Sequence, residues 1–180
     1  MSNTITQYNS IIAICREIFI KKAKDYGTSW RIMRMSSITD QIFIKAQRIR
    51  TIQEVGNQQV DEDIHSEFIA IVNYSIIGLI QLQLMAEKNV DLELTRLAEL
   101  YDWHVDFARE LMNRKNHDYG EAWRLMRISS LVDLLLMKVM RVKQIEDNKN
   151  LTIASEGVDA NYYDMLNYAI FALIRLKDVN

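Results

Sequence analysis

Hydrophobic residues recur every three or four positions along most of the chain, which is the spacing of one face of an α-helix. Polar segments that contain glycine or asparagine separate these stripes. The clearest stripes are Met35, Ile42, Phe43, Ala46 and Ile49, and Ile128, Leu131, Leu135, Val139 and Val142. The pattern predicts helices over about residues 4–24, 29–54, 61–88, 92–116, 121–147 and 159–177.

Turn-forming residues are scarce, because the 180 residues include no proline and five glycines. An all-β protein needs many tight turns, and proline and glycine supply most of them. Gly27 follows the first predicted helix, where a left-handed C-terminal turn is expected, and Gly56 ends the second. We therefore predict an all-α protein of about six helices joined by few turns.

The chain contains an internal repeat. Residues 25–37 return 93 positions later, and 12 of the 24 pairs that start from residues 25–48 are identical. Farther along, an offset of 94 aligns Asn73 with Asn167. Two copies are too few for a solenoid, so they are expected to pack like the subunits of a symmetric dimer. The prediction is two pseudo-twofold-related three-helix repeats packed together as a single domain, residues 1–90 and 91–180.

Several charged residues are identical in the two copies, whereas many hydrophobic residues differ. A core position needs only volume and apolarity, but a retained charge needs a partner. On the second predicted helix of each repeat, an indole, two guanidinium groups and an ammonium group share one side, within roughly 80°. Guanidinium groups bind phosphates, and an indole can stack on a base. The predicted substrate-binding residues are Trp30, Arg34, Lys45 and Arg48, with their copies Trp123, Arg127, Lys138 and Arg141.

A structural interpretation of the same residues is equally open. Arg34 and Arg48 could pair with acids of the third predicted helix, and Trp30 could fill the core. A buried network of ion pairs would also be retained, because removing one partner is costly. A cleft with unpaired arginines would favour the functional interpretation, and internal ion pairs would favour the structural one.

Carboxylates are candidate ligands for a metal ion, and Mg²⁺ is the ion that we expect them to bind. At two aligned positions of the third predicted helix, each copy keeps only one of the two acids, because Glu67 aligns with Asn161 and Ala70 aligns with Asp164. The two acids could be the remnants of two sites, or they could complete one composite site; a solvated helix face is the structural alternative. The candidate metal ligands are Asp40, Asp133, Glu67 and Asp164.

The composition and charge of the chain limit the kinds of partner and site that we expect. The net charge of −2 gives no reason to expect bulk nucleic-acid binding. Cys15 is the single cysteine, which excludes an intramolecular disulfide and a cysteine-rich zinc site. The histidines, His65, His104 and His117, have no repeat partners and are expected at the surface. No apolar run reaches the roughly 18 residues of a membrane span, and the first residues lack a signal-peptide layout, so we expect a cytoplasmic protein without a membrane partner.

The segment 115–124 contains the run Asp118-Tyr119-Gly120-Glu121-Ala122-Trp123-Arg124 and is followed by Arg127, Ser129, Ser130, Asp133, Lys138 and Arg141. It resembles the nucleotide modification-associated domain type 1 family, whose members occur in bacteria and phages. The first copy resembles the family from Lys24 to Arg48 and departs from the second copy at Ala70. The resemblance implies a role near modified or unusual deoxynucleotides, and it names no reaction.

Two hypotheses from different classes follow. The first is a protein that binds a small-molecule nucleotide, with a Mg²⁺-dependent (deoxy)nucleotide phosphohydrolase, or an accessory of modified-nucleotide metabolism, as its more specific form. The second is a non-enzymatic helical scaffold or partner-binding module, including a homo-oligomer, whose retained charges form structural ion pairs.

Overall fold

The computed structural model describes residues 3–56, 63–149 and 156–179. In these residues the protein is all-α, as the sequence predicts, with two short 3₁₀ turns and no strand. Its elements are α1 (Asn3–Tyr26), η1 (Ser29–Ile32), α2 (Met35–Val55), α3 (Ile64–Gln83), α4 (Leu94–Tyr119), η2 (Ala122–Leu125), α5 (Ile128–Asp147) and α6 (Val158–Val179). The order helix, 3₁₀ turn, helix, helix occurs twice, which matches the two copies seen in the sequence.

The second helix of each repeat begins later than the apolar pattern indicates. Gly27 adopts a φ of 63° and ends α1 as expected, and its copy Gly120, with a φ of 59°, ends α4 in the same way. A single 3₁₀ turn and two extended residues, Met33 and Arg34, follow before α2 begins at Met35. The Arg31 guanidinium then donates to the carbonyl oxygen of Leu84 at 3.1 Å. This tertiary contact holds η1 against the end of α3.

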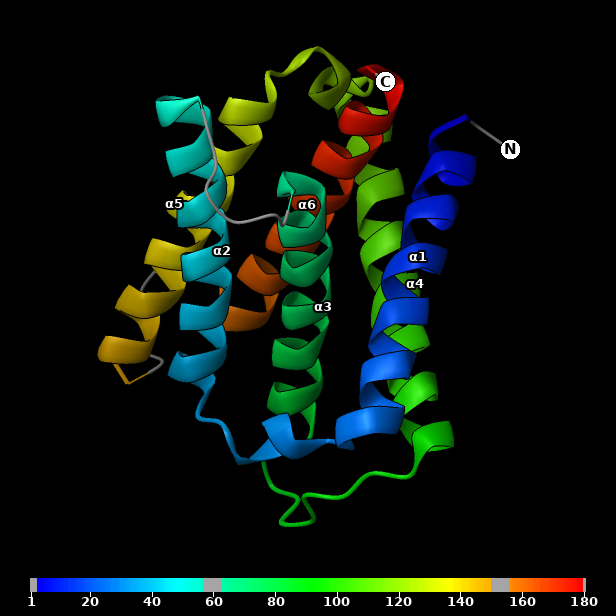
Figure 1. The fold of residues 1–180 in the computed structure, drawn as a ribbon, viewed down its shortest axis with the longest axis vertical. Coiled ribbons are helices and arrows are strands. Elements are labelled where there is room, and N and C mark those ends of the chain that lie inside the picture. Colours follow the sequence, from blue (N-terminus) through cyan, green and yellow to red (C-terminus); the bar gives the residue numbers. More distant parts are fainter. Residues whose placement is uncertain (1–2, 57–62, 150–155, 180) are drawn as a thin grey trace.

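Four helices form the central bundle, in the cyclic order α2, α3, α6 and α5 (Figure 1). Helices α1 and α4 lie together and cover the side of α3 and α6 (Figure 1). Helix α3 has the length and hydropathy of a membrane span, but 67% of that stretch is buried inside the bundle. A helix that is hydrophobic nearly all round is what the centre of a bundle requires.

Paired hydrogen bonds join the repeats across the pseudo-twofold axis. The Asn73 side-chain amide donates to the Cys15 carbonyl oxygen at 3.0 Å, within its own repeat. Its oxygen accepts from the Tyr101 hydroxyl of the other repeat at 3.0 Å. The corresponding set is Asn167, Ala108 and Tyr8, with distances of 3.1 Å and 2.9 Å. Each asparagine therefore satisfies buried polar groups of both repeats, much as symmetry-related residues do at a dimer interface.

Candidate functional site

The predicted substrate-binding cations on α2 and α5 mostly face carboxylates of the third helix in each repeat. In the first repeat, Glu67 accepts from Lys45 at 3.3 Å and also pairs with Arg48. In the second repeat, Asp164 pairs with Lys138 at 2.6 Å and with Lys115 at 2.6 Å. Lys45, Arg48 and Lys138 therefore lie in internal ion pairs.

The same pairs explain why each repeat keeps an acid at only one of two aligned positions on its third helix. Ala70 aligns with Asp164, and Glu67 lies three residues earlier, about one helical turn away. Lys45 and its copy Lys138 thus each keep a carboxylate from the third helix, but at positions one turn apart. Glu67 and Asp164 lie in separate ion pairs, and the structure does not bring them together as a composite metal site.

The other two candidate metal ligands, Asp40 and Asp133, each contact a basic residue of the other repeat. Asp40 on α2 pairs with Lys143 on α5 at 2.6 Å, and Asp133 on α5 approaches Arg50 on α2 at 3.8 Å. Because Arg50 and Lys143 align at the offset of 93, the two contacts are related by the pseudo-twofold. In the described parts of the chain, no three histidine, cysteine or acidic side chains are grouped so that they could hold a metal ion.

The remaining predicted residues differ between the two repeats. Arg34, Arg127 and Arg141 are exposed. Trp123 is buried, and its ring stacks on Phe171 with centroids 4.3 Å apart and planes 5° apart. Trp30 is half-buried and lines a cavity. The structure therefore separates residues that the helical pattern placed in one stripe.

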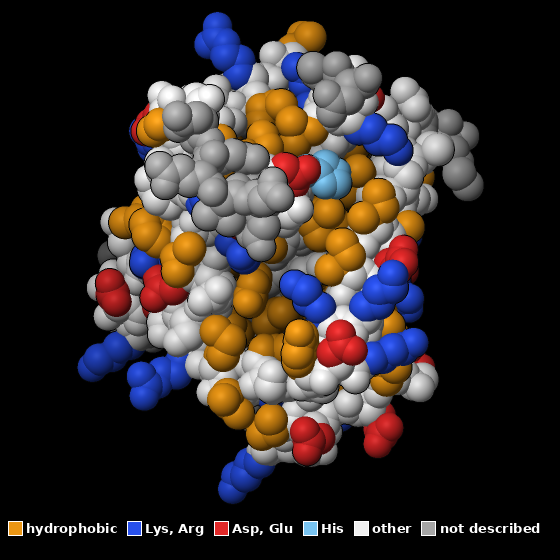
Figure 2. Space-filling view, in the orientation of Figure 1, with side chains coloured by type: hydrophobic (Ala, Val, Ile, Leu, Met, Phe, Trp, Pro, Cys, Tyr) orange, Lys and Arg blue, Asp and Glu red, His pale blue; other side chains and the backbone are white. Residues whose placement is uncertain are grey.

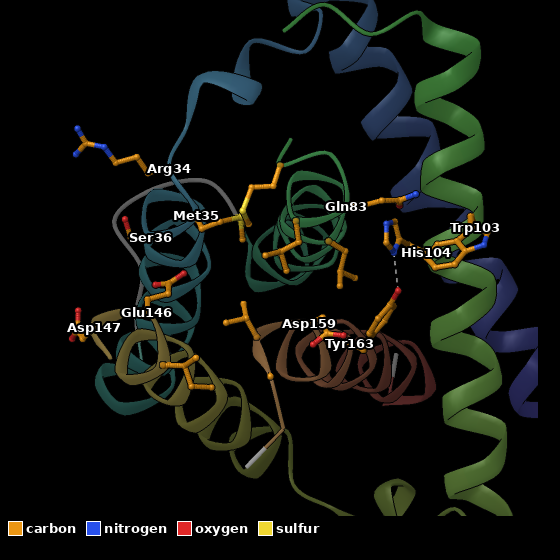
Figure 3. A pocket seen from close by; sticks show the side chains of 16 residues that line it. Arg34, Met35, Ser36, Gln83, Trp103, His104, Glu146, Asp147, Asp159 and Tyr163 are labelled. Carbon is orange, nitrogen blue, oxygen red and sulfur yellow. Dashed lines mark hydrogen bonds between the residues drawn. The ribbon is translucent and has the colours of Figure 1, made fainter. Parts of the chain in front are cut away.

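A cavity of about 930 Å³ lies at one end of the central bundle. The first residues of α2 and α6 and the last residues of α3 and α5 surround it, and α4 forms a side wall (Figure 3). Arg34, Ser36 and Asp147 lie at its rim, where the Arg34 guanidinium points away from the centre (Figure 3). Arg34 makes no ion pair with any residue that the structure describes, so its charge is open to a ligand.

A wall of aromatic side chains closes the cavity on the α4 side (Figure 3). Trp103 is 55% exposed, and its ring meets the His104 ring edge to face, with centroids 4.7 Å apart. His104 Nδ1 lies 2.8 Å from the Tyr163 hydroxyl. His104 Nε2 is buried and has no hydrogen-bond partner among the described residues. Such a polar atom beside a cavity is a ready contact for a ligand.

Burial determines the protonation states of the titratable side chains in this wall. It lowers the pKa of His104 to about 4, so the imidazole is neutral at physiological pH. It also raises the pKa of Tyr163 to about 12, which keeps the hydroxyl protonated. Across the cavity, burial raises the pKa of Glu146, whose Oε1 lies 2.9 Å from the Thr39 hydroxyl. The imidazole, the phenol and the carboxyl group inside the cavity are therefore polar, and none of the three is positively charged at physiological pH.

Sequence reasoning missed this wall, and the expectation of a surface position for His104 is wrong. His104 is only 3% exposed. A signal was present, because His104 follows Leu97 and Tyr101 at helical intervals and precedes Ala108 by four residues, and all of these face the core. The absence of a repeat partner, which suggested a surface residue, instead reflects divergence of the two copies.

We expect the buried imidazole to make stability depend on pH. The unfolded chain binds a proton at His104 below about pH 6.5, whereas the folded chain resists it down to about pH 4. The contribution of His104 to the free energy of unfolding is therefore present above about pH 6.5 and is lost as the pH falls toward about 4. From pH 6.5 to pH 5 the free energy of unfolding should drop by about 2 kcal/mol from this group. Urea titrations at both pH values measure the drop.

The His104→Gln variant should lose this contribution, and His117→Gln, which changes an exposed histidine, should keep it. The same pH dependence in both variants would show that His104 is not the responsible group.

A second cavity, of about 400 Å³, lies between α1, η1 and α3. Figure 2 shows a hollow with hydrophobic walls on the face that carries these elements, with basic side chains at its edge. Lys22, Trp30 and Tyr74 are among its lining residues, and none of the described lining residues is an aspartate or a glutamate.

The fold and the cavities define a class: an all-α protein made of two copies of one three-helix unit, with ligand-sized cavities beside its repeated motif. The family model of nucleotide modification associated domain 1 matches residues 22–82 and 115–176. The chain belongs to this family, in two tandem copies. No curated protein and no solved structure was found to match it. The matched regions include Arg34 and Tyr163, whereas Trp103 and His104 lie outside them.

Proposed function

We propose that the protein binds a nucleotide in the 930 Å³ cavity, with Mg²⁺ accompanying the phosphates. The observation that carries this proposal is the aromatic wall, in which an exposed indole adjoins a buried imidazole nitrogen that lacks a partner. Ligand pockets of about 300–1,000 Å³ usually combine apolar walls with a few converging polar groups. The family, whose description associates it with nucleotide modification, supports a nucleotide as the ligand.

The base would lie against the α4 wall. Trp103 is 55% exposed although its ring also stacks on Phe107, and base stacking on an aromatic ring contributes about 1–3 kcal/mol. His104 Nε2 can exchange one hydrogen bond with the edge of the base, because the other ring nitrogen is engaged by Tyr163.

The phosphates would lie at the rim, near the N-terminus of α2. This helix has 21 residues, and Arg34, Met35 and Ser36 at its start line the cavity. The unpaired N–H groups and the dipole of a helix N-terminus attract phosphate, and the Arg34 guanidinium adds a charge that can turn inward. Arg34 is the one predicted substrate-binding residue on this cavity.

The carboxylates of the cavity are the reason for including Mg²⁺. Glu146, Asp147 and Asp159 line it, so an unneutralised phosphate would be repelled. Mg²⁺ is commonly held by one or two carboxylates together with substrate phosphates. Hydrolysis of the nucleotide is the more specific form of the proposal, since a metal can also stabilise charge in phosphoryl transfer.

A thermal-shift and calorimetric panel of deoxynucleoside mono- and triphosphates, with and without Mg²⁺, tests the proposal. We expect Mg²⁺-dependent binding that Trp103→Ala weakens by about tenfold or more, because the stacking face is lost. Arg34→Ala should weaken it by about tenfold, through loss of a charge-assisted contact. Arg127→Ala is the matched control, since Arg127 is the exposed repeat copy of Arg34 and lies away from this cavity.

Equal losses in Arg34→Ala and Arg127→Ala would place binding elsewhere. An absence of binding by every nucleotide with Mg²⁺ would reject the proposal and leave the scaffold hypothesis. Where binding is found, release of phosphate or pyrophosphate from the bound nucleotide distinguishes an enzyme from a binding protein.

A further inference from the structure

The 400 Å³ cavity of the first repeat has a filled counterpart in the second. Helix α1, η1 and α3 surround the cavity, and α4, η2 and α6 are their copies. The two repeats share the lysine and the tryptophan at this place, Lys22 with Lys115 and Trp30 with Trp123. A comparison of the two repeats shows which side chains of the second have no counterpart in the first.

Three side chains of the second repeat satisfy that lysine and tryptophan. Asp164 accepts from Lys115 at 2.6 Å. Asn116 Oδ1 accepts from Trp123 Nε1 at 3.2 Å. Phe171 stacks on the Trp123 ring, with centroids 4.3 Å apart and nearly parallel planes. One carboxylate, one hydrogen-bond acceptor and one aromatic ring thus converge on the pair.

The first repeat has a smaller residue at each of these three positions. Ala70 replaces the carboxylate, Ala23 replaces the amide, and Ile77 replaces the aromatic ring. All three line the cavity, as do Lys22 and Trp30. Among the described residues, Lys22 has no ion-pair partner and Trp30 Nε1 has no hydrogen-bond acceptor.

We propose that the 400 Å³ cavity binds a planar aromatic anion that supplies the three missing groups. The ring lies on Trp30, as Phe171 lies on Trp123. A polar atom of the ring accepts from Trp30 Nε1, and a phosphate or carboxylate pairs with Lys22. In the second repeat, the side chains of Asp164, Asn116 and Phe171 occupy the place that the ligand takes in the first. The second repeat therefore cannot bind the ligand.

This site is separate from the one proposed above. It lies between α1, η1 and α3, whereas the 930 Å³ cavity involves none of the residues that line it. Among the residues that the structure describes, no carboxylate lines it, so binding is expected to require no Mg²⁺. One ligand is expected per chain, because only the first repeat is open.

Isothermal titration calorimetry in EDTA tests the proposal on the full chain. The probes are dAMP, indole-3-acetate, deoxyadenosine and inorganic phosphate, so that ring and anion are offered together and apart. We expect dAMP or indole-3-acetate to bind at one per chain, and deoxyadenosine and phosphate to bind at least tenfold more weakly. Binding of dAMP alone identifies a phosphate as the anion, and binding of indole-3-acetate alone identifies a carboxylate. If neither binds, the proposal is overturned.

The decisive variant rebuilds the second repeat in the first: Ala23→Asn, Ala70→Asp and Ile77→Phe together. We expect it to bind the ligand at least 30-fold more weakly and to unfold at the same or a higher temperature, because the added groups fill the cavity and satisfy Lys22 and Trp30. Ala13→Asp is the matched control, since it adds a carboxylate at an exposed position of α1 away from the cavity.

Further variants separate this site from the large cavity. Lys22→Met should weaken binding of the anionic probe by about tenfold, whereas Lys24→Met, an exposed neighbour that does not line the cavity, should leave it unchanged. Trp103→Ala should also leave it unchanged. Binding that survives the triple substitution, or that is lost in Trp103→Ala, overturns the proposal.

Discussion

Replacing Asp164 with alanine is expected to lower the free energy of unfolding by about 3–5 kcal/mol. The carboxylate lies 2.6 Å from both Lys138 and Lys115. The Lys138 side chain is only 8% exposed, so the variant would leave a buried ammonium without its partner. For a chain of this size the melting temperature should fall by about 10 °C. Differential scanning calorimetry and urea titration measure the two quantities.

A double variant separates the lost ion pair from lost packing. Asp164→Ala combined with Lys138→Met replaces the buried pair by apolar groups, which is often neutral or stabilising. We expect it to recover most of the stability lost in Asp164→Ala. A cost below about 1 kcal/mol for Asp164→Ala, or no recovery in the double variant, would show that this pair does not stabilise the second repeat.

Replacing Gly78 with alanine is expected to cost about 3 kcal/mol or more, because there is no room for a methyl group where α3 meets α6. A Cβ at Gly78 would lie 2.2 Å from Cε1 of Tyr162 and 2.7 Å from Cζ. The Tyr162 ring is fully buried, and its hydroxyl lies 2.9 Å from the Thr39 hydroxyl, so the ring cannot easily move. Chemical denaturation of the variant measures the cost.

The repeat provides the controls for this prediction. Ala172 and Phe68 are the copies of Gly78 and Tyr162. Ala172→Gly should cost only about 1 kcal/mol, the usual penalty of glycine within a helix. Adding Tyr162→Phe to Gly78→Ala should recover part of the loss, because the ring is then free of its hydrogen bond and can shift. A cost for Gly78→Ala no larger than that for Ala172→Gly would contradict the close approach.

The two repeats illustrate how a duplicated unit can keep its fold while its sites diverge. Contacts that join the repeats remain paired, as in the exchanged bonds of Asn73 and Asn167 and the cross-repeat contacts of Asp40 and Asp133. Some contacts within a repeat have changed. The acid that pairs with Lys45 lies one turn from the acid that pairs with Lys138.

Much of the fold could be read from the sequence, because helix formation and duplication leave local signals. The apolar period placed the six helices, and Gly27 and Gly56 marked two helix ends correctly. The start of α2 was misplaced because the bonds of Arg31 to the end of α3 are long-range. A pattern along one helix cannot register a contact with another.

The candidate site could be read only in part. Local sequence was enough to establish which charges and aromatic rings exist, that the chain folds as two copies of one helical unit, and that it belongs to its family. The tertiary structure alone decided that Lys45 and Lys138 face acids, that His104 lines a cavity, and that Trp30 and Trp123 lie in open and filled surroundings. The reason is physical: a helix is specified by neighbours in sequence, whereas an ion pair or a cavity depends on which side chains of different helices lie within a few ångströms of each other.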